Sequence, residues 1–215
     1  DRHYDNGILY IIETGSNIIC MIDLKNKTFK RHYHRGESDK KYHINTMYID
    51  DQFIYIVEHN KTEHTGIPSK VVFYTYDFNL VGCMDNMGTA SHNVWIEGDY
   101  LYVCSSMDEG IIKRHLKSKK QEFIDISKYC TGLTRGVAHV DGYRYIGISK
   151  FANREERHLS GDSVILILDE DWNYIDKINL GDTGQLLEIR AIDGIDKCHN
   201  RIPFPKDLKE TLLNI

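Results

Sequence analysis

The sequence predicts an all-β protein with the fold of a small four-bladed β-propeller. The first reason is a repeat, in which two apolar runs are joined at Asp or Gly, at 45–57, 92–104 and 135–147. A tyrosine in the second run recurs after 47 and then 43 residues, which fits one four-stranded blade of about 40–50 residues. The second reason is local, since short apolar runs separated by Asp, Asn and Gly are typical of strands and turns.

Three complete units follow from the repeat. After its first two runs, each unit continues with two more strand-like runs that are joined by a polar turn. The units span residues 45–84, 92–124 and 135–178. We expect each unit to form one blade of four strands.

The two ends of the chain are predicted to share one composite blade. Residues 6–33 begin with "NGILYIIE", which has the form of a second strand with no first strand before it. "LLEIRAIDG" (186–194) has the form of a first strand with no second strand after it. Pairing of 186–192 with 7–12 would close the ring by strand exchange between the N- and C-termini, and would remove the unpaired edge between the first and last blades.

We therefore expect a single domain over residues 1–215, in which 195–215 form a C-terminal tail. The alternative is a propeller of five blades with one degenerate blade, for which the chain length leaves little room.

Composition narrows the possible partners. The formal net charge of −5 argues against a general nucleic-acid-binding protein. No apolar run approaches the roughly 18 residues that a membrane span requires. The five cysteines form no CxxC or similar cluster, which indicates reduced thiols in a reducing compartment. We expect a cytoplasmic protein without a membrane partner, and the sequence indicates neither a cofactor nor an oligomeric state.

The first strands of a propeller line its central channel, so their first residues surround its entrance. The equivalent positions in the four units are Asn45, His92, Arg135 and Leu187. The residues that follow them are Thr46, Asn93, Gly136 and Glu188. A purely structural repeat has no reason to place such different polar residues at equivalent positions, and this pattern favours a binding site.

Two connections on the same face are longer than a turn requires. They span residues 58–69 and 149–162, and long loops usually bind or cover something. The second loop would bring Lys150, Arg154 and Arg157 towards the entrance.

These positions predict binding of a small anionic metabolite or sugar derivative at the channel mouth. Guanidinium groups pair with carboxylate or phosphate through two parallel hydrogen bonds. The other candidate ligand-binding residues are Asn45, Asn93 and Arg135 at the entrance and Ser149 at the start of the long loop.

His92 and Glu188 are the candidate catalytic residues. A carboxylate beside a histidine forms a general acid–base pair, which would suit a lyase, hydrolase or transferase acting on an anionic sugar or nucleotide-type substrate. The structural alternative is a buried histidine that is hydrogen-bonded to a backbone carbonyl.

Two other functions stay open. One is a protein-interaction scaffold with a plugged channel, and the other is a metal-dependent enzyme that uses loop histidines. One histidine among the four entrance positions gives no symmetric metal cage, so no metal ligand is predicted. An open pocket lined by His92, Arg135 and Glu188 would favour ligand binding, and a filled channel would favour the scaffold.

The stretch "LTRGVAHVDGYRYIGISKFANREER" (133–157) resembles a group of uncharacterised bacterial propeller-like proteins. The resemblance covers roughly the C-terminal half of the chain. It implies a propeller, and it implies shared polar residues at Arg135, Ser149, Lys150 and Arg154. It implies no particular reaction.

Overall fold

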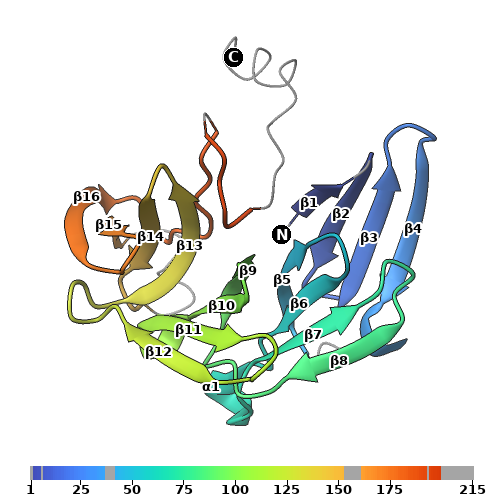
Figure 1. The fold of residues 1–215 in the computed structure, drawn as a ribbon, viewed down its shortest axis with the longest axis horizontal. Helices are drawn as coiled ribbons and strands as arrows, with labels where there is room; N and C mark the ends of the chain where they lie inside the picture. Colours follow the sequence, from blue (N-terminus) through green and yellow to red (C-terminus); the bar gives the residue numbers. More distant parts are fainter. Residues whose placement is uncertain (1, 6, 37–41, 153–160, 193, 200–215) are drawn as a thin grey trace.

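The computed structural model describes residues 2–5, 7–36, 42–152, 161–192 and 194–199. They form four antiparallel sheets of four strands each, in which the strands follow one another in chain order. Figure 1 shows the four sheets arranged around a common centre, with the first strand of each sheet nearest to it. The architecture is a β-propeller-like fold.

Each sheet is one continuous stretch of the chain. Sheet 1 contains β1 (Arg2–Asp5), β2 (Ile8–Glu13), β3 (Ile18–Asp23) and β4 (Thr28–Tyr33). Sheet 2 contains β5 (Ile44–Ile49), β6 (Ile54–Glu58), β7 (Lys70–Tyr74) and β8 (Leu80–Met84). Sheet 3 contains β9 (His92–Glu97), β10 (Tyr100–Ser105), β11 (Gly110–His115) and β12 (Gln121–Asp125). Sheet 4 contains β13 (Leu133–Val140), β14 (Tyr143–Ser149), β15 (Asp162–Asp169) and β16 (Tyr174–Asp182). The short helices are η1 (His34–Gly36), α1 (Thr62–Thr65) and η2 (Ser106–Asp108).

The predicted closure by strand exchange is wrong. β1 supplies the first strand of sheet 1 and pairs antiparallel with β2, in register from Arg2↔Ile11 to Asp5↔Ile8. Residues 186–192 belong to no strand. A polar stretch of four residues has no apolar alternation, so the sequence pattern gave no sign of β1; the strand is defined by its backbone pairing with β2.

The strands differ in burial according to their apolar content. Every residue of β6 is buried, whereas almost every residue of the outer strand β4 is exposed. Trp95 is 1% exposed and stacks on Tyr102, with ring centroids 5.1 Å apart. These aromatic side chains therefore pack inside the repeat, as expected. In the part of the chain described, no helix has the length and apolar character needed to cross a bilayer.

A buried side chain connects each sheet to the segment that follows it at the channel. In each case an amide or hydroxyl group in the connection between the second and third strands, or at the last residue of the second strand, binds a backbone group where the next segment begins. The bonds are Ile44 N to Asn17 Oδ1 (3.2 Å), Ser91 N to Ser69 Oγ (3.0 Å), Ser106 Oγ to Thr134 O (2.8 Å) and Leu186 N to Ser149 Oγ (2.8 Å). The fourth bond places Leu186 where the first strand of a further blade would begin.

The segment after Leu186 packs directly on sheet 4 without joining a sheet. A Cβ atom added to Gly136 would lie 3.0 Å from the carbonyl carbon of Glu188, and one added to Gly147 would lie 3.3 Å from Cβ of Leu186. Figure 1 shows this segment, in orange-red, between β13 and sheet 1. Residues 186–192 thus resemble a first strand in position, as their sequence does, but have no second strand beside them. Residues 200–215 of the predicted tail lie outside the described residues.

Candidate functional site

A β-bulge interrupts the first strand of sheets 2, 3 and 4 at the predicted channel entrance. The register shifts between Ile44 and Thr46 in β5, opposite Val103 and Cys104 in β9, and between Thr134 and Val137 in β13. Bulges release residues from the ladder and redirect their side chains. The entrance residues are therefore directed by backbone irregularities, which periodic sequence patterns do not reveal.

Three of the predicted ligand-binding residues hydrogen-bond to the next segment of the chain. Asn45 Nδ2 donates to Ser91 O at 2.9 Å. Asn93 Oδ1 accepts from Gly136 N at 2.8 Å. Ser149 Oγ accepts from the backbone of the segment that follows sheet 4. These polar groups contribute to contacts between successive sheets.

His92 and Arg135 lie side by side, as their equivalent positions in the repeat predicted. Arg135 Nη2 donates to His92 Nε2. A guanidinium group can only donate, so His92 carries its hydrogen on Nδ1, which lies 2.8 Å from Ala90 O and 2.9 Å from Ser106 Oγ. Burial, together with the charge of Arg135, holds the pKa of His92 well below its usual value. His92 is therefore neutral, and both of its ring nitrogens are engaged.

Two further histidines extend this arrangement. The ring of His59 lies edge-on to His43 and to His92, with centroid distances of 5.1 and 5.0 Å. Burial, together with the nearby His43 and Arg135, lowers the pKa of His59 to about 4, against the opposing effect of Glu63. We call His43, His59, His92 and Arg135 the mouth cluster.

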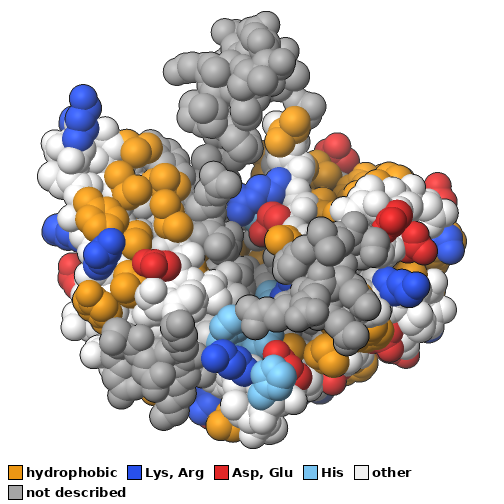
Figure 2. Space-filling model, turned by 180° about the vertical axis from the view of Figure 1, so that it is seen from behind, with side chains coloured by type: hydrophobic (Ala, Val, Ile, Leu, Met, Phe, Trp, Pro, Cys, Tyr) orange, Lys and Arg blue, Asp and Glu red, His pale blue; other side chains and the backbone are white. Residues whose placement is uncertain are grey.

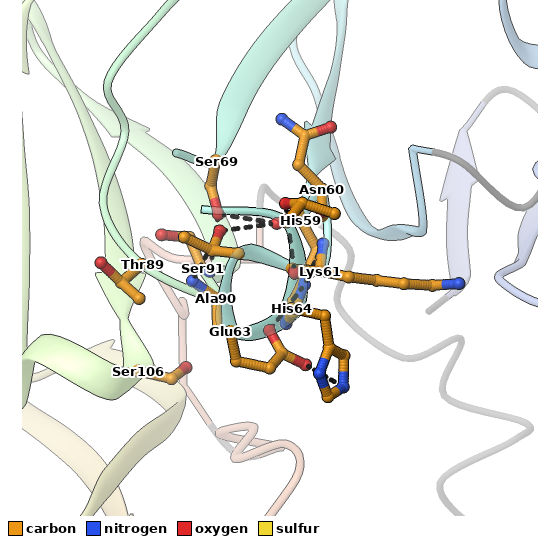
Figure 3. Close-up of polar contacts among 12 residues, drawn as sticks. His59, Asn60, Lys61, Glu63, His64, Ser69, Thr89, Ala90, Ser91 and Ser106 are labelled. Carbon is orange, nitrogen blue, oxygen red and sulfur yellow. Dashed lines mark hydrogen bonds and ion pairs between the residues drawn. The ribbon is translucent and has the colours of Figure 1, made fainter. Parts of the chain in front are cut away.

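The loop after β6 forms one side of the mouth cluster. Ser69 Oγ donates to His59 O at 3.2 Å and accepts from the backbone of Ser91, so the loop is attached to the start of β9 (Figure 3). Lys61 N donates to His59 Nδ1 at 3.1 Å, and Glu63 lies 3.9 Å from the same nitrogen. Figure 2 shows histidine side chains gathered beside basic and acidic ones on this face of the molecule.

The second long loop is described only at its ends. Lys150 is exposed, and its backbone N–H bonds to Asp162 O at 3.0 Å. The predicted ligand-binding residues Arg154 and Arg157 lie outside the described residues.

The predicted catalytic partners His92 and Glu188 each have another partner. Glu188 Oε1 lies 2.9 Å from Nε2 of His199 and 3.4 Å from Nδ2 of Asn93. His199 was missed because it lies outside the repeat, in the stretch "DKCHN". Its only sequence signal was the change from an apolar run to a polar one after residue 194.

His199 also contacts a second carboxylate. Its Nδ1 lies 2.9 Å from Oδ2 of Asp196. Burial alone would lower the pKa of His199, but the hydrogen bonds with Asp196 and Glu188 outweigh burial and raise the pKa above its usual value. The imidazole is thus held between two carboxylates and favours the protonated form.

A small pocket, which we call the channel pocket, opens beside this pair. Its lining comes from β5, β9, β13 and the segment after sheet 4: Thr46, Met47, Tyr48, Asn93, Val94, Trp95, Val137, Glu188, Arg190, Cys198 and His199. It has room for about one water molecule. Of the three residues expected to line an open pocket, Glu188 does so, whereas His92 and Arg135 lie in the adjacent mouth cluster.

A metal-dependent enzyme would require metal ligands among the histidines. Outside the gaps at residues 37–41, 153–160 and the other undescribed positions, no three His, Cys, Asp or Glu side chains are arranged to hold a metal ion. All five cysteines are free thiols.

Comparison with known proteins identifies the fold only. No protein-family model and no curated protein matches the chain. The chain is similar to a chain in the crystal structure of a nidogen/laminin complex, with a TM-score of 0.55 and 14% identity over 84% of this chain. It spans 64% of the length of that chain. A luciferin-regenerating enzyme gives a TM-score of 0.48 at 10% identity, over 90% of this chain and 79% of that one. At this level of identity, the likeness to the nidogen/laminin structure establishes a β-propeller-like fold and nothing about ligands or activity.

Proposed function

We propose that this protein binds a small anionic molecule at the mouth cluster. The observation that carries the proposal is the packing of Arg135 against His92, and of His92 against His59, at the channel mouth. Burial, together with the charge of Arg135, lowers the pKa of both histidines, and the guanidinium group contributes a positive potential at their rings. An anion in this position would be stabilised by that potential and would raise both pKa values.

Each residue has a definite part in this proposal. Arg135 supplies the positive charge that suits carboxylate or phosphate, while its Nη2 donates to His92 and its Nη1 donates to Gln185 Oε1 at 3.2 Å. His92 accepts a hydrogen bond from Arg135 and so fixes the orientation of the guanidinium group, which makes it a positioning residue. Lys150 and Lys61 lie on the flanking loops and add positive charge at the rim. No reaction is part of the proposal, because both ring nitrogens of His92 already have partners.

Binding of simple anions tests the proposal directly. Isothermal titration with phosphate, sulfate and small carboxylates is expected to detect binding to the wild type. Arg135→Gln should weaken it by about 10- to 100-fold, because a charge-assisted hydrogen bond contributes roughly 1.5–3 kcal/mol. Arg31→Gln is the matched control, since Arg31 is exposed on the outer strand β4. Equal affinity in Arg135→Gln and the control would contradict the proposal.

The narrowness of the channel favours one second candidate, a protein-interaction scaffold. Among the described residues, core side chains and the segment after sheet 4 surround the channel pocket, which has room for about one water molecule. The same titration separates the two functions, because a scaffold would bind none of these anions at the mouth cluster.

A further inference from the structure

The channel pocket combines apolar walls with a few convergent polar groups. Met47, Val94 and Val137 form part of its walls. Asn93, Glu188 and His199 place amide, carboxylate and imidazole groups at its edge. A polar cavity of this kind accepts a hydrogen-bonding group, whereas an empty packing defect would be lined by apolar groups alone.

The acidic and basic groups of the pocket are held in a fixed geometry. Asp196 accepts hydrogen bonds from the backbone N–H groups of His139, Ala191 and Cys198, at 3.0–3.1 Å. Asp196 in turn binds Nδ1 of His199, which directs Nε2 towards Glu188. The side chain of Glu188 is one-third exposed, so a ligand can reach its carboxylate.

The size and charge of the pocket indicate what it can accept. The imidazolium of His199 lies between two carboxylates, and Arg190 adds a second positive charge to the lining, so opposite charges balance. A neutral group that both donates and accepts hydrogen bonds suits such surroundings. Because the space fits about one water molecule, a single hydroxyl group matches it in size as well.

The pocket adjoins the mouth cluster through two strands. Asn93 directly follows His92 in β9, and Gly136 directly follows Arg135 in β13. Asn93 hydrogen-bonds to both Gly136 and Glu188. The pocket and the mouth cluster are therefore contiguous along both strands.

We infer that the channel pocket receives a hydroxyl group of the ligand whose anionic group binds the mouth cluster, so that the ligand is an anionic polyol. Glu188 accepts a hydrogen bond from this hydroxyl, and His199, which is bonded to Glu188 through Nε2, holds the carboxylate in place. This inference rests on the proposed function, to which it adds the chemical class of the ligand.

Two ligands that differ only in hydroxyl groups provide the test. Glycerol 3-phosphate and propyl phosphate carry the same anionic group on a three-carbon chain. Titration calorimetry on the wild type is expected to show about 10-fold tighter binding of glycerol 3-phosphate, the worth of one hydrogen bond to a charged group. D-glycerate and propionate repeat the comparison with a carboxylate.

Single-residue variants then test whether the preference for the hydroxyl-bearing ligand depends on the channel pocket. Glu188→Gln keeps the shape of the side chain and should reduce the preference to less than about 3-fold, while the affinity for propyl phosphate stays unchanged. Arg135→Gln should weaken both ligands by the same factor. Near-ultraviolet circular dichroism establishes that each variant is folded, and His199→Gln serves as a second pocket variant.

The outcomes distinguish the two proposals. Absence of binding by every anion would contradict the proposed function and this inference together. Equal binding of glycerol 3-phosphate and propyl phosphate to the wild type would overturn the inference alone. A hydroxyl preference that persists in both Glu188→Gln and His199→Gln would also overturn it, because the hydroxyl would then bind elsewhere.

Discussion

Two clusters of histidine and arginine lie where neighbouring sheets meet, and they have different partners. Between sheets 1 and 2, His34 Nε2 lies 2.7 Å from Glu58 Oε1, and Arg35 Nε donates to the same oxygen at 2.5 Å. Tyr74 Oη lies 3.0 Å from the other nitrogen of His34. In the mouth cluster, by contrast, His92 accepts its hydrogen bond from a guanidinium group.

In the first cluster, a carboxylate of the protein itself has the role that we propose for an anionic ligand in the mouth cluster. Glu58 is 1% exposed; burial would raise its pKa, but the hydrogen bonds from His34 and Arg35 outweigh burial and lower it. His59, the residue after Glu58, belongs to the mouth cluster, where burial and nearby positive charge lower its pKa. Successive side chains thus serve two different contacts between sheets. The first cluster carries its own anion, and we propose that the second receives one from solution.

The largest effect is expected when the internal carboxylate is neutralised. Glu58→Gln leaves His34 and Arg35 against a neutral amide, and loss of one partner of a buried ion pair typically costs about 3–5 kcal/mol. Urea denaturation should show this loss in the free energy of unfolding. Glu63→Gln is the control, because the Glu63 side chain is 38% exposed and should change stability by less than about 0.5 kcal/mol. Similar losses in both variants would contradict the assigned role of Glu58.

Acid should destabilise the protein through the mouth cluster before it affects Glu58. The pKa of His59 is about 4 in the folded state against 6.5 ordinarily, so the unfolded chain binds more protons between these values. Stability is therefore lost as the pH falls from about 6.5 towards 4. The contribution of Glu58, whose folded pKa is lowered, is lost only as the pH falls below its ordinary value of 4.5.

Denaturation at pH 7 and pH 5 measures this effect. His59→Gln should reduce the loss of stability between the two pH values. Phosphate should stabilise the wild type more at pH 5 than at pH 7, because an anion favours protonated imidazoles. An unchanged pH dependence in His59→Gln would show that His59 does not set the acid sensitivity.

The smallest effects are expected when the hydroxyl groups beside His34 and His92 are removed. Tyr74→Phe removes the partner of His34, and Ser106→Ala removes a partner of His92. Each should lower the free energy of unfolding by about 1 kcal/mol. Only Ser106→Ala should also weaken phosphate binding, by about 2- to 5-fold, because His92 then orients Arg135 less well. Equal effects of both variants on binding would remove the distinction between the clusters.

The sequence by itself determined most of the strands, the repeat, and the fact that His92 and Arg135 are neighbours. Alternation of apolar and polar residues is local, so it predicted strands near 45–84, 92–124 and 135–178. Equivalent positions in a repeat have equivalent places in the fold, and this brought His92 next to Arg135. The same pattern assigned 186–194 to a first strand, and the segment does lie in such a position.

Only the tertiary structure decided which segment supplies the first strand of sheet 1 and which side chains contact one another. It also decided that the mouth cluster and the channel pocket are separate. β1 is defined by hydrogen bonds to β2, and pairing depends on the partner strand rather than on the polar stretch itself. The bond between Glu188 and His199, and the cluster of His34, Arg35 and Glu58, join residues from different segments. Most of these residues lie outside strands, so strand alternation leaves no periodic mark of their contacts in the sequence.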